Sequence, residues 1–344
     1  MSQKNITIYD LAKEAGVSPA TVSRILNGTT AVSPKKREAV MTLIHKYQFQ
    51  PNALARALSE KRSRLIAMVV AHAENSYYNS LFAACESEAY RRGYVTVLLS
   101  THSVPETEES VIRRMGELRP DAVILCGGRI DLAEPDPDFI RMLASLSERM
   151  RLVVGSQSPR PGIPGIAVDH EKSMELALSY LTSLGHREIG FVYTGAPYYG
   201  TVQRLTRFSA IMDAMHLPLH PEWLIEVPEY DIPSGVIGAE RILALSHRPT
   251  AILGMNDMVS SGILQGLLAH GVQVPQDISL LGFDDTFVTR IAAPHLTSIG
   301  YDYPTYARLL LDAALYEGDP GEYPQNQIIP VYLKVRDSCR RLDV

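Results

Sequence analysis

The 344-residue sequence predicts an all-α N-terminal head with a helix-turn-helix, followed by a larger α/β body of two doubly wound lobes. Helix start and stop signals divide residues 1–47 into three short helices. After residue 64, apolar strands alternate with helices in two successive series. Charge divides at the same place: residues 1–64 hold eleven Lys/Arg against four Asp/Glu, a net charge of +7, and the remainder holds 22 against 34, a net charge of −12. A basic head on an acidic body is typical of a protein that reads a polyanion.

The overall composition is that of an ordinary globular protein, with 46% hydrophobic and 21% charged residues. No run of 18 apolar residues occurs, so we expect no membrane span, and the first eight residues lack the apolar stretch of a signal peptide. The three cysteines lack CxxC spacing, which argues against a zinc site or a disulfide framework and favours a reducing cytoplasm. Cys85 and Cys126 lie in apolar segments and are expected in the core. We therefore predict no metal, no cofactor and a cytoplasmic location.

In the head, each helix has its own start signal. Thr7 followed by Asp10 resembles a capping box that lacks only the favoured Glu or Gln, and Gly16 supplies the stop. Ser-Pro pairs at 18–19 and 33–34 then begin a second and a third helix. Two short helices joined by a glycine turn form the helix-turn-helix pattern. The second helix is therefore available for the major groove of DNA.

In the body, apolar runs predict strands and 3.6-residue periodicity predicts helices. The first series has strands at 65–70, 94–99, 122–125 and 152–154 with helices at 79–92 and 106–118. The second has a helix at 172–184 and strands at 189–193, 223–227, 250–253 and 278–282. Ligands of such sheets bind beyond the carboxyl ends of the strands.

Two segments of the head closely resemble the N-terminal signature of the lac repressor (LacI/GalR) family: TIYDLAKEAGVSPATVSRILNG at 7–28 and YQFQPNALARAL at 47–58. The resemblance implies a helix-turn-helix DNA-binding domain over residues 1–50. It also implies a hinge helix and linker over 51–61, and an effector-binding domain over 62–344. The hinge would order when two subunits meet on DNA.

The same resemblance identifies the positions that contact DNA. Arg24 matches a base-reading position and suits a bidentate contact to guanine, with a phosphate contact as the alternative. Pro19 and Ala20 match two more, but their side chains cannot hydrogen-bond, so they read thymine methyls or shape. Leu58 matches a leucine that wedges into the minor groove. The full predicted set is Thr7, Ser18, Pro19, Ala20, Thr21, Ser23, Arg24, Asn27, Asn52, Ala55 and Leu58.

The body carries further signatures of the family, LGHREIG at 184–190, ND at 256–257, GFDD at 282–285 and PHLTSI at 294–299. They make it similar to type I periplasmic sugar-binding proteins, in which the chain crosses repeatedly between two lobes. The resemblance implies a first lobe of about 62–164 and 300–326. The second lobe then comprises about 165–299 and 327–344.

Six residues are predicted to bind the effector: Tyr77, Tyr78, Arg204, Tyr230, Asn256 and Asp284. Arg204 begins the family's R-x-x-G-F pattern, in which Arg207 here replaces the glycine, so either arginine could reach the ligand. An arginine and a carboxylate flanked by aromatic rings suit a polar, ring-shaped ligand such as a sugar. Four other residues near these motifs could also contact the ligand, but a purely structural or surface role is the alternative for each. Asp169 is equally a helix cap, His186 is structural, and Tyr198 and Tyr199 are surface residues.

The resemblance implies a ligand-responsive transcription regulator, above all a repressor, that binds a pseudopalindromic operator as a homodimer. The expected effector is a sugar or sugar derivative, and the alternatives are a purine or nucleoside sensor and an activator. An enzyme is disfavoured, with no catalytic residue predicted, because no GxSxG, P-loop, GxGxxG or HExxH motif occurs. A transport-type binding protein is opposed by the basic head and by the missing signal peptide.

Overall fold

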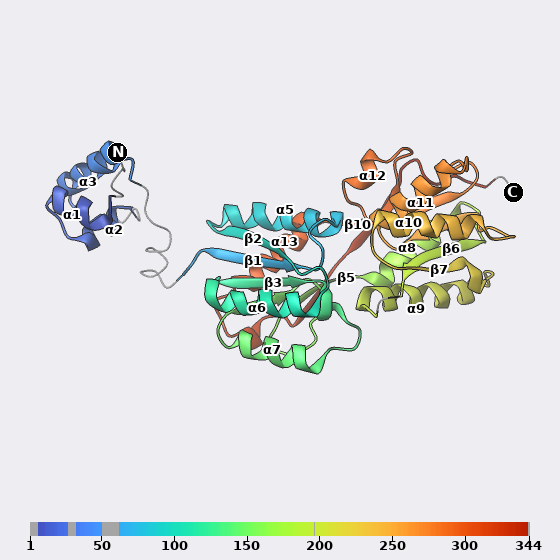
Figure 1. Ribbon diagram of the computed structural model, residues 1–344, viewed down its shortest axis with the longest axis horizontal. Coiled ribbons are helices and arrows are strands. Elements are labelled where there is room, and N and C mark those ends of the chain that lie inside the picture. The colour runs from blue at the N-terminus through green and yellow to red at the C-terminus, as the bar shows by residue number, and fades with distance from the viewer. Residues whose placement is uncertain (1–5, 27–31, 50–61, 196, 343–344) are drawn as a thin grey trace. The chain divides into compact units, whose positions relative to one another are not determined.

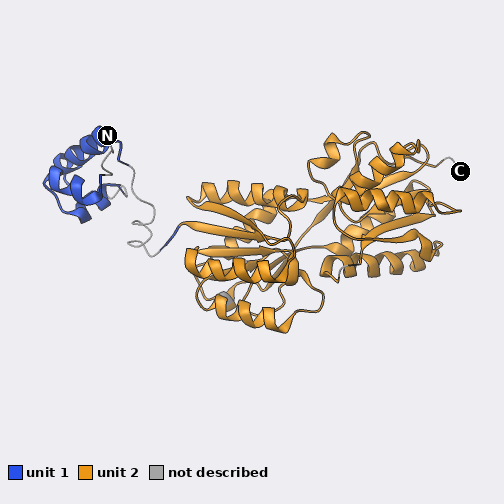
Figure 2. Ribbon diagram, in the orientation of Figure 1, with its two compact units in different colours: residues 1–63 blue, residues 64–344 orange. Residues whose placement is uncertain are grey.

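The computed structural model describes residues 6–26, 32–49, 62–195 and 197–342. The chain separates into two compact units, residues 1–63 and residues 64–344 (Figure 2). We call the first the head and the second the body.

The described residues of the head form three helices, α1 (Ile8–Ala15), α2 (Pro19–Leu26) and α3 (Pro34–Tyr47) (Figure 1). The capping box is complete with aspartate at its third position. The Asp10 amide donates to Thr7 Oγ1 at 3.3 Å, and the Thr7 amide donates to Asp10 Oδ2 at 2.9 Å. Gly16 ends α1 with φ of 65°, in the left-handed region that favours glycine. The predicted helix-turn-helix is thus confirmed.

A small apolar core holds these helices together. Its fully buried members are Leu11, Ala12, Val22, Ile25 and Val40. At the edge of this core, the Glu14 carboxylate of α1 accepts hydrogen bonds from Lys46 at 2.9 Å and from the Tyr47 hydroxyl at 2.9 and 3.0 Å. The bond from Lys46 is the largest cause that lowers the pKa of Glu14. The described head therefore has its own core and its own links between α1 and α3.

The body contains two six-stranded sheets with equivalent connectivity. The first runs β11-β5-β4-β3-β1-β2, all parallel, with bounds β1 (Leu65–Val70), β2 (Val95–Ser100), β3 (Ala122–Cys126), β4 (Arg151–Val154), β5 (Gly165–Val168) and β11 (Asn326–Ile329). The second runs β12-β10-β9-β8-β6-β7, with bounds β6 (Ile189–Thr194), β7 (Leu224–Val227), β8 (Ala251–Gly254), β9 (Ser279–Asp284), β10 (Thr297–Tyr301) and β12 (Val331–Lys334). Among the strands that the structure describes, only β12 is antiparallel to its neighbour.

Helices cover both faces of each sheet, as Figure 1 shows. The first sheet is covered by α5 (Ser76–Arg91) and α13 (Tyr303–Ala314) on one face and by α6 (Pro105–Leu118) and α7 (Pro137–Ser147) on the other. The second is covered by α8 (His170–Ser183) and α9 (Tyr199–Ala214) on one face and by α10 (Ile232–Leu243) and α11 (Asp257–Ala269) on the other. The short α12 (Val288–Ile291) follows β9. The predicted two-lobed α/β architecture is confirmed.

The lobe boundaries differ from those predicted. The strand β5 pairs with β4 and β11 in the first sheet, so the chain leaves the first lobe after Val168 rather than near residue 164. Likewise β11 belongs to the first sheet and β12 to the second, so the last crossing lies at Pro330 instead of residues 326–327. The crossing between β10 and α13 falls near residue 302. The edge strands β5 and β11 have four residues each, too short for periodicity alone to locate.

The helices α10 and α11 pack with their backbones unusually close. A side chain at Gly262 would meet the carbonyl oxygen of Ile232, and one at Gly235 would meet the carbonyl oxygen of Val259. Glycine is required at both positions because there is no room for a Cβ. In the part of the chain that the structure describes, no helix is long and apolar enough to cross a membrane.

Candidate functional site

The outer side of α2 presents the predicted base-reading residues. Pro19, Ala20 and Arg24 are exposed, whereas Val22 and Ile25 are buried against the head core. Arg24 makes no hydrogen bond or ion pair with a residue that the structure describes, so its guanidinium is available to a partner. Among these three exposed side chains, only that of Arg24 can donate a hydrogen bond to a base edge.

The predicted polar contacts around α2 have local partners. The Thr21 amide donates to Ser18 Oγ at 3.2 Å, and the Ser18 and Thr21 hydroxyls lie 2.9 Å apart. The Thr7 hydroxyl donates to Asp10 at 2.7 Å. Ser23 is half-buried. Their DNA contacts stay predictions, and Asn27, Asn52, Ala55 and Leu58 lie outside the described residues.

A cavity of about 400 Å³ lies between the lobes, at the carboxyl ends of the strands of both sheets. All six residues predicted to bind the effector line it, namely Tyr77, Tyr78, Arg204, Tyr230, Asn256 and Asp284. They come from both lobes and are separated by up to about 200 positions in sequence. The structure thus brings the predicted set together, while its contact with an effector stays a prediction.

Arg204 and Asp284 form a buried charged pair on the second-lobe wall. Arg204 is 5% exposed; its Nη1 donates to the Met255 carbonyl at 2.7 Å and its Nη2 lies 4.0 Å from Asp284 Oδ1. The guanidinium packs over the Phe283 ring at 4.4 Å, and its buried Nε has no partner among the described residues. Burial raises the pKa of Asp284 to about 6, although Arg204 and the Tyr301 hydroxyl oppose the rise. The pair keeps free hydrogen-bonding capacity that a ligand in the cavity can use.

Asn256 and Tyr230 support one another as well as lining the cavity. Asn256 caps α11, where its Oδ1 accepts from the Val259 amide at 2.7 Å, and its Nδ2 donates to the Tyr230 carbonyl at 3.2 Å. The Tyr230 hydroxyl lies 2.5 Å from Thr201 Oγ1. The Asn256 side chain therefore has a structural role and retains only one free N–H for a ligand.

Tyr77 and Tyr78 form the first-lobe wall. They belong to the first turn of α5, which begins at Ser76 with Asn75 as its cap, rather than to a loop before a helix at residue 79 as the sequence predicts. Their rings meet edge to face at 5.0 Å. Gly127, with φ of 81°, leaves the space that the Tyr78 hydroxyl fills. Burial raises the pKa of both hydroxyls well above the usual value, so they stay protonated donors.

Asp131 and His170 are among the cavity residues that the sequence analysis did not identify. Asp131 ends a 3-10 helix, Gly128–Asp131, that follows β3, and His170 is the first residue of α8 after β5; neither belongs to a motif. Asp131 Oδ1 and His170 Nδ1 are buried and have no hydrogen-bond partner among the described residues. Burial raises the pKa of Asp131 to about 6, while burial, and then Arg204, lower that of His170 well below its usual value. The neutral imidazole of His170 and the weakly acidic carboxyl group of Asp131 therefore add two further hydrogen-bonding groups to the lining of the cavity.

The raised pKa of Asp131 predicts a pH-dependent stability. A carboxyl group whose pKa is higher in the folded chain stabilises it below the unfolded pKa, and this stabilisation is lost as the pH rises through about 6. Relative to wild type, Asp131→Asn should therefore gain about 2 kcal/mol of unfolding free energy between pH 4 and pH 7. Denaturant midpoints of the ligand-free chain measure this, with the exposed Asp138→Asn as control. Parallel wild-type and Asp131→Asn profiles would contradict it.

The alternatives left open by the sequence are partly resolved. Arg207 pairs with Glu175 on α8 and does not line the cavity, so Arg204 is the arginine that faces it. Asp169 caps α8, accepting from the Lys172 amide at 2.8 Å. His186 is buried, 3.0 Å from Thr250 and 3.1 Å from the Arg340 carbonyl. Tyr198 and Tyr199, expected on the surface, line the cavity instead. Cys85 and Cys126 are buried, as predicted.

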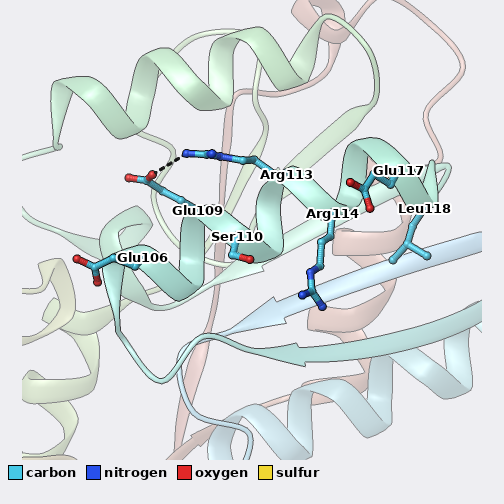
Figure 3. A pocket seen from close by; sticks show the side chains of 7 residues that line it. All are labelled: Glu106, Glu109, Ser110, Arg113, Arg114, Glu117 and Leu118. Carbon is cyan, nitrogen blue, oxygen red and sulfur yellow. Dashed lines mark hydrogen bonds and ion pairs between the residues drawn. The ribbon is translucent and has the colours of Figure 1, made fainter.

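A second hollow, on α6, differs in kind from the cavity. Its lining consists entirely of residues from that one helix, including Glu106, Arg113 and Arg114, and Arg113 pairs with Glu109 at 3.2 Å (Figure 3). A single helix supplies only one wall, and these charged side chains partly satisfy each other. The interlobe cavity is therefore the stronger candidate for a ligand site.

Comparisons with known proteins agree with this arrangement of head and body. A family model for "Bacterial regulatory proteins, lacI family" matches residues 7–52, and one for a "Periplasmic binding protein-like domain" matches residues 178–339. The HTH-type transcriptional repressor PurR of Vibrio parahaemolyticus is 31% identical over 296 residues, which cover 85% of this chain and 86% of PurR.

Solved structures show the same likeness. The lac repressor dimer bound to operator and the anti-inducer ONPF matches with a TM-score of 0.85 at 26% identity, covering 98% of this chain and all of the repressor chain. A LacI family transcriptional regulator from Lactobacillus casei with bound sucrose matches with a TM-score of 0.68 at 26% identity, covering 80% of this chain and 99% of its own. The signatures in the head, the two-lobed body and these relatives lead to one conclusion: the chain belongs to the lacI family of bacterial regulatory proteins.

Proposed function

We propose that this chain is a transcriptional repressor that binds a pseudopalindromic operator as a homodimer and is controlled by a small polar ring, a sugar or sugar derivative. The observation that carries the effector proposal is the cavity wall. There, the buried Arg204–Asp284 pair keeps unused hydrogen-bonding groups beside a set of tyrosine rings. Hydroxyl groups of a sugar suit such donors and acceptors, and its apolar faces suit the rings. The bound sucrose of the Lactobacillus casei relative supports the same class.

A purine or nucleoside is the second candidate. The Tyr198 and Tyr230 rings lie 6.0 Å apart at 44° to one another, and both line the cavity. Such rings offer flat faces to a planar base. The two ligand classes make different demands, because a base needs a face-on ring whereas a sugar needs several hydroxyl partners.

The proposed control is thermodynamic linkage between cavity and operator. The lobes already touch at the cavity, where the Ala133 amide donates to the Pro197 carbonyl at 2.8 Å and the Thr286 hydroxyl donates to Ser76 Oγ at 3.1 Å. A ligand that contacts both lobes favours one lobe arrangement over another. That preference changes the dimer geometry available for DNA and hence the affinity for the operator. In this proposal the chain performs no catalysis and works on DNA in the cytoplasm.

DNA selection by the full chain tests the operator proposal. From a random duplex pool, the chain should enrich inverted repeats whose half-sites are related by two-fold symmetry, because a symmetric dimer presents two α2 helices. The enriched site should be bound with an affinity that falls steeply with salt. Recovery of unrelated sequences would contradict the proposal.

Thermal-shift screening with sugars, sugar phosphates, nucleobases and nucleosides tests the effector proposal. A ligand at 100 times its dissociation constant should stabilise the chain by about 2.7 kcal/mol and change its affinity for the selected site. Arg204→Gln and Asp284→Asn should each weaken that ligand by roughly 10- to 100-fold, because a charged hydrogen-bonding partner is lost. Arg207→Gln, on the same helix but outside the cavity, is the matched control. Unchanged ligand affinity in both cavity variants would reject the assignment.

A further inference from the structure

Three potential metal ligands lie close together, His72, Glu74 and His102, and His72 also lines the cavity. One ligand atom from each lies within 4.8 Å of the others, and His72 Nδ1 lies 3.5 Å from Glu74 Oε1. Across the described ranges of the chain, this is the one group of three or more histidine, cysteine or acidic side chains close enough to share an ion. His72 follows β1 and His102 follows β2, and these strands are paired neighbours.

The two turns that carry these residues are tied to each other. The Thr101 amide and hydroxyl both donate to the Val70 carbonyl, at 2.9 and 3.3 Å, and the Ala73 amide donates to Ser100 Oγ at 3.2 Å. His102 and Ser103 both have φ of 54°, a left-handed backbone that costs free energy in residues other than glycine. The hydrogen bonds therefore fix the two turns relative to each other, so the backbone positions of the three ligands are set before any ion binds.

A second contact suits His72 for coordination through Nδ1. Its other ring nitrogen, Nε2, lies 3.1 Å from Ser103 Oγ. Metal-binding histidines almost always donate their non-coordinating N–H to a neighbour, which fixes the ring and the tautomer. A proton on Nε2, donated to Ser103, leaves the Nδ1 lone pair directed at the position that Glu74 also reaches.

We propose that His72, Glu74 and His102 bind a divalent transition metal ion of the zinc type. Two imidazoles and one carboxylate are the ligand set of an open tetrahedral zinc site, with bonds of about 2.0–2.2 Å. Ligand atoms around such an ion lie about 3.3 Å apart, so the present separations need only small side-chain rotations. The site was not expected from the sequence. Cysteine spacing argued against zinc, and the two histidines are 30 positions apart with no motif between them.

The ion would lie beside the effector cavity, because His72 and Ser103 also line that cavity. Ser103 also hydrogen-bonds with Tyr198 of the second lobe. Burial raises the pKa of the Tyr198 hydroxyl, and the bond with Ser103 opposes this rise. The fourth coordination position is free for water or for a ligand oxygen. Metal binding would thus be a second control beside the proposed effector. The proposal of a metal site does not depend on which effector the cavity binds.

Metal titration of the full chain, freed of metal by a chelator, tests the proposal. Zinc should bind with a stoichiometry of one per chain in competition with a chromophoric chelator, and cobalt should give the visible absorption of a tetrahedral site. The His72→Ala/His102→Ala double variant should lose this binding. Glu74→Gln should weaken it at least 10-fold, and Ser103→Ala, which removes the partner of His72 Nε2, should weaken it by about 10- to 100-fold.

A second pair of nearby histidines supplies the control. The His220 and His247 rings are 6.2 Å apart, and each histidine faces a glutamate. The His220→Ala/His247→Ala variant should bind one zinc ion with wild-type affinity. Glu74 is largely exposed, so Glu74→Gln keeps the fold intact and the test decisive even if the double variant is unstable. Absence of stoichiometric binding, or equal losses in both histidine pairs, would overturn the proposal in favour of nonspecific surface histidines.

Discussion

Replacing Arg24 by alanine is expected to lower the affinity of the chain for its selected operator by about 10- to 100-fold, with binding to unrelated DNA nearly unchanged. Arg24 is exposed on α2, and among its neighbours at the base-reading positions Pro19 and Ala20 have no side-chain donor. Loss of a bidentate contact to guanine therefore removes most of the hydrogen-bonded discrimination. Competition titrations of operator against random duplex, at two salt concentrations, measure the ratio of specific to nonspecific affinity.

Lys13→Ala provides a charge-matched control on α1, because it removes one exposed positive charge from the same head. It should weaken operator and random DNA to a similar degree. If Arg24→Ala behaved in the same way, Arg24 would be a phosphate contact, the alternative that its sequence position leaves open. In that outcome, sequence discrimination would come from apolar contacts and DNA shape.

Replacing Gly262 by alanine is expected to lower the free energy of unfolding of the body by about 3 kcal/mol. The added methyl group would collide with the Ile232 carbonyl and with the backbone of Gly235, so α10 and α11 must separate. Backbone cannot rotate away as a side chain can. Denaturant unfolding followed by the single tryptophan, Trp223, measures the loss, because this buried residue belongs to the second lobe.

Gly116→Ala is the matched control for this substitution. Gly116 lies within α6, and a Cβ there meets nothing within 4 Å. Alanine should therefore raise stability by up to about 1 kcal/mol through the lower entropy of the unfolded chain. A wild-type denaturation midpoint for Gly262→Ala would show that the two helices can move apart without cost.

The helices of the head could be predicted from the sequence because the residues that begin and end them lie close to one another in the chain. The Thr7–Asp10 cap, the Gly16 stop and the Ser18-Pro19 start lie within a few residues of the bonds that they form, and Pro34 is the first residue of α3. They predicted the three helices that the structure describes in the head to within about a residue. Asp10 also performs the role for which Glu or Gln was expected, since its shorter carboxylate still reaches the Thr7 amide.

The cavity was predicted only in part, because it is assembled from distant segments. Arg204, Asp284 and the tyrosines were found through family signatures, and the structure places them on one wall or the other. Asp131 and His170 had no signature, and only the assembled fold brings both of them to the cavity. The same holds for His72 and His102, which only the pairing of β1 with β2 brings together. The periodicity of apolar residues shows which face of a helix or strand is buried, but it does not show which helices and strands pack against each other.

The crossings between lobes impose an order on biosynthesis. The described head core draws only on residues before 50, so this unit can fold as soon as it leaves the ribosome. The first lobe must wait, because α13 and β11 follow nearly all of the second lobe in the chain, and β12 follows them both. Neither sheet is complete until residues beyond 326 have emerged. At the usual rate of about 5–20 residues per second, the DNA-binding head is finished roughly 15 to 60 seconds before the domain proposed to regulate it.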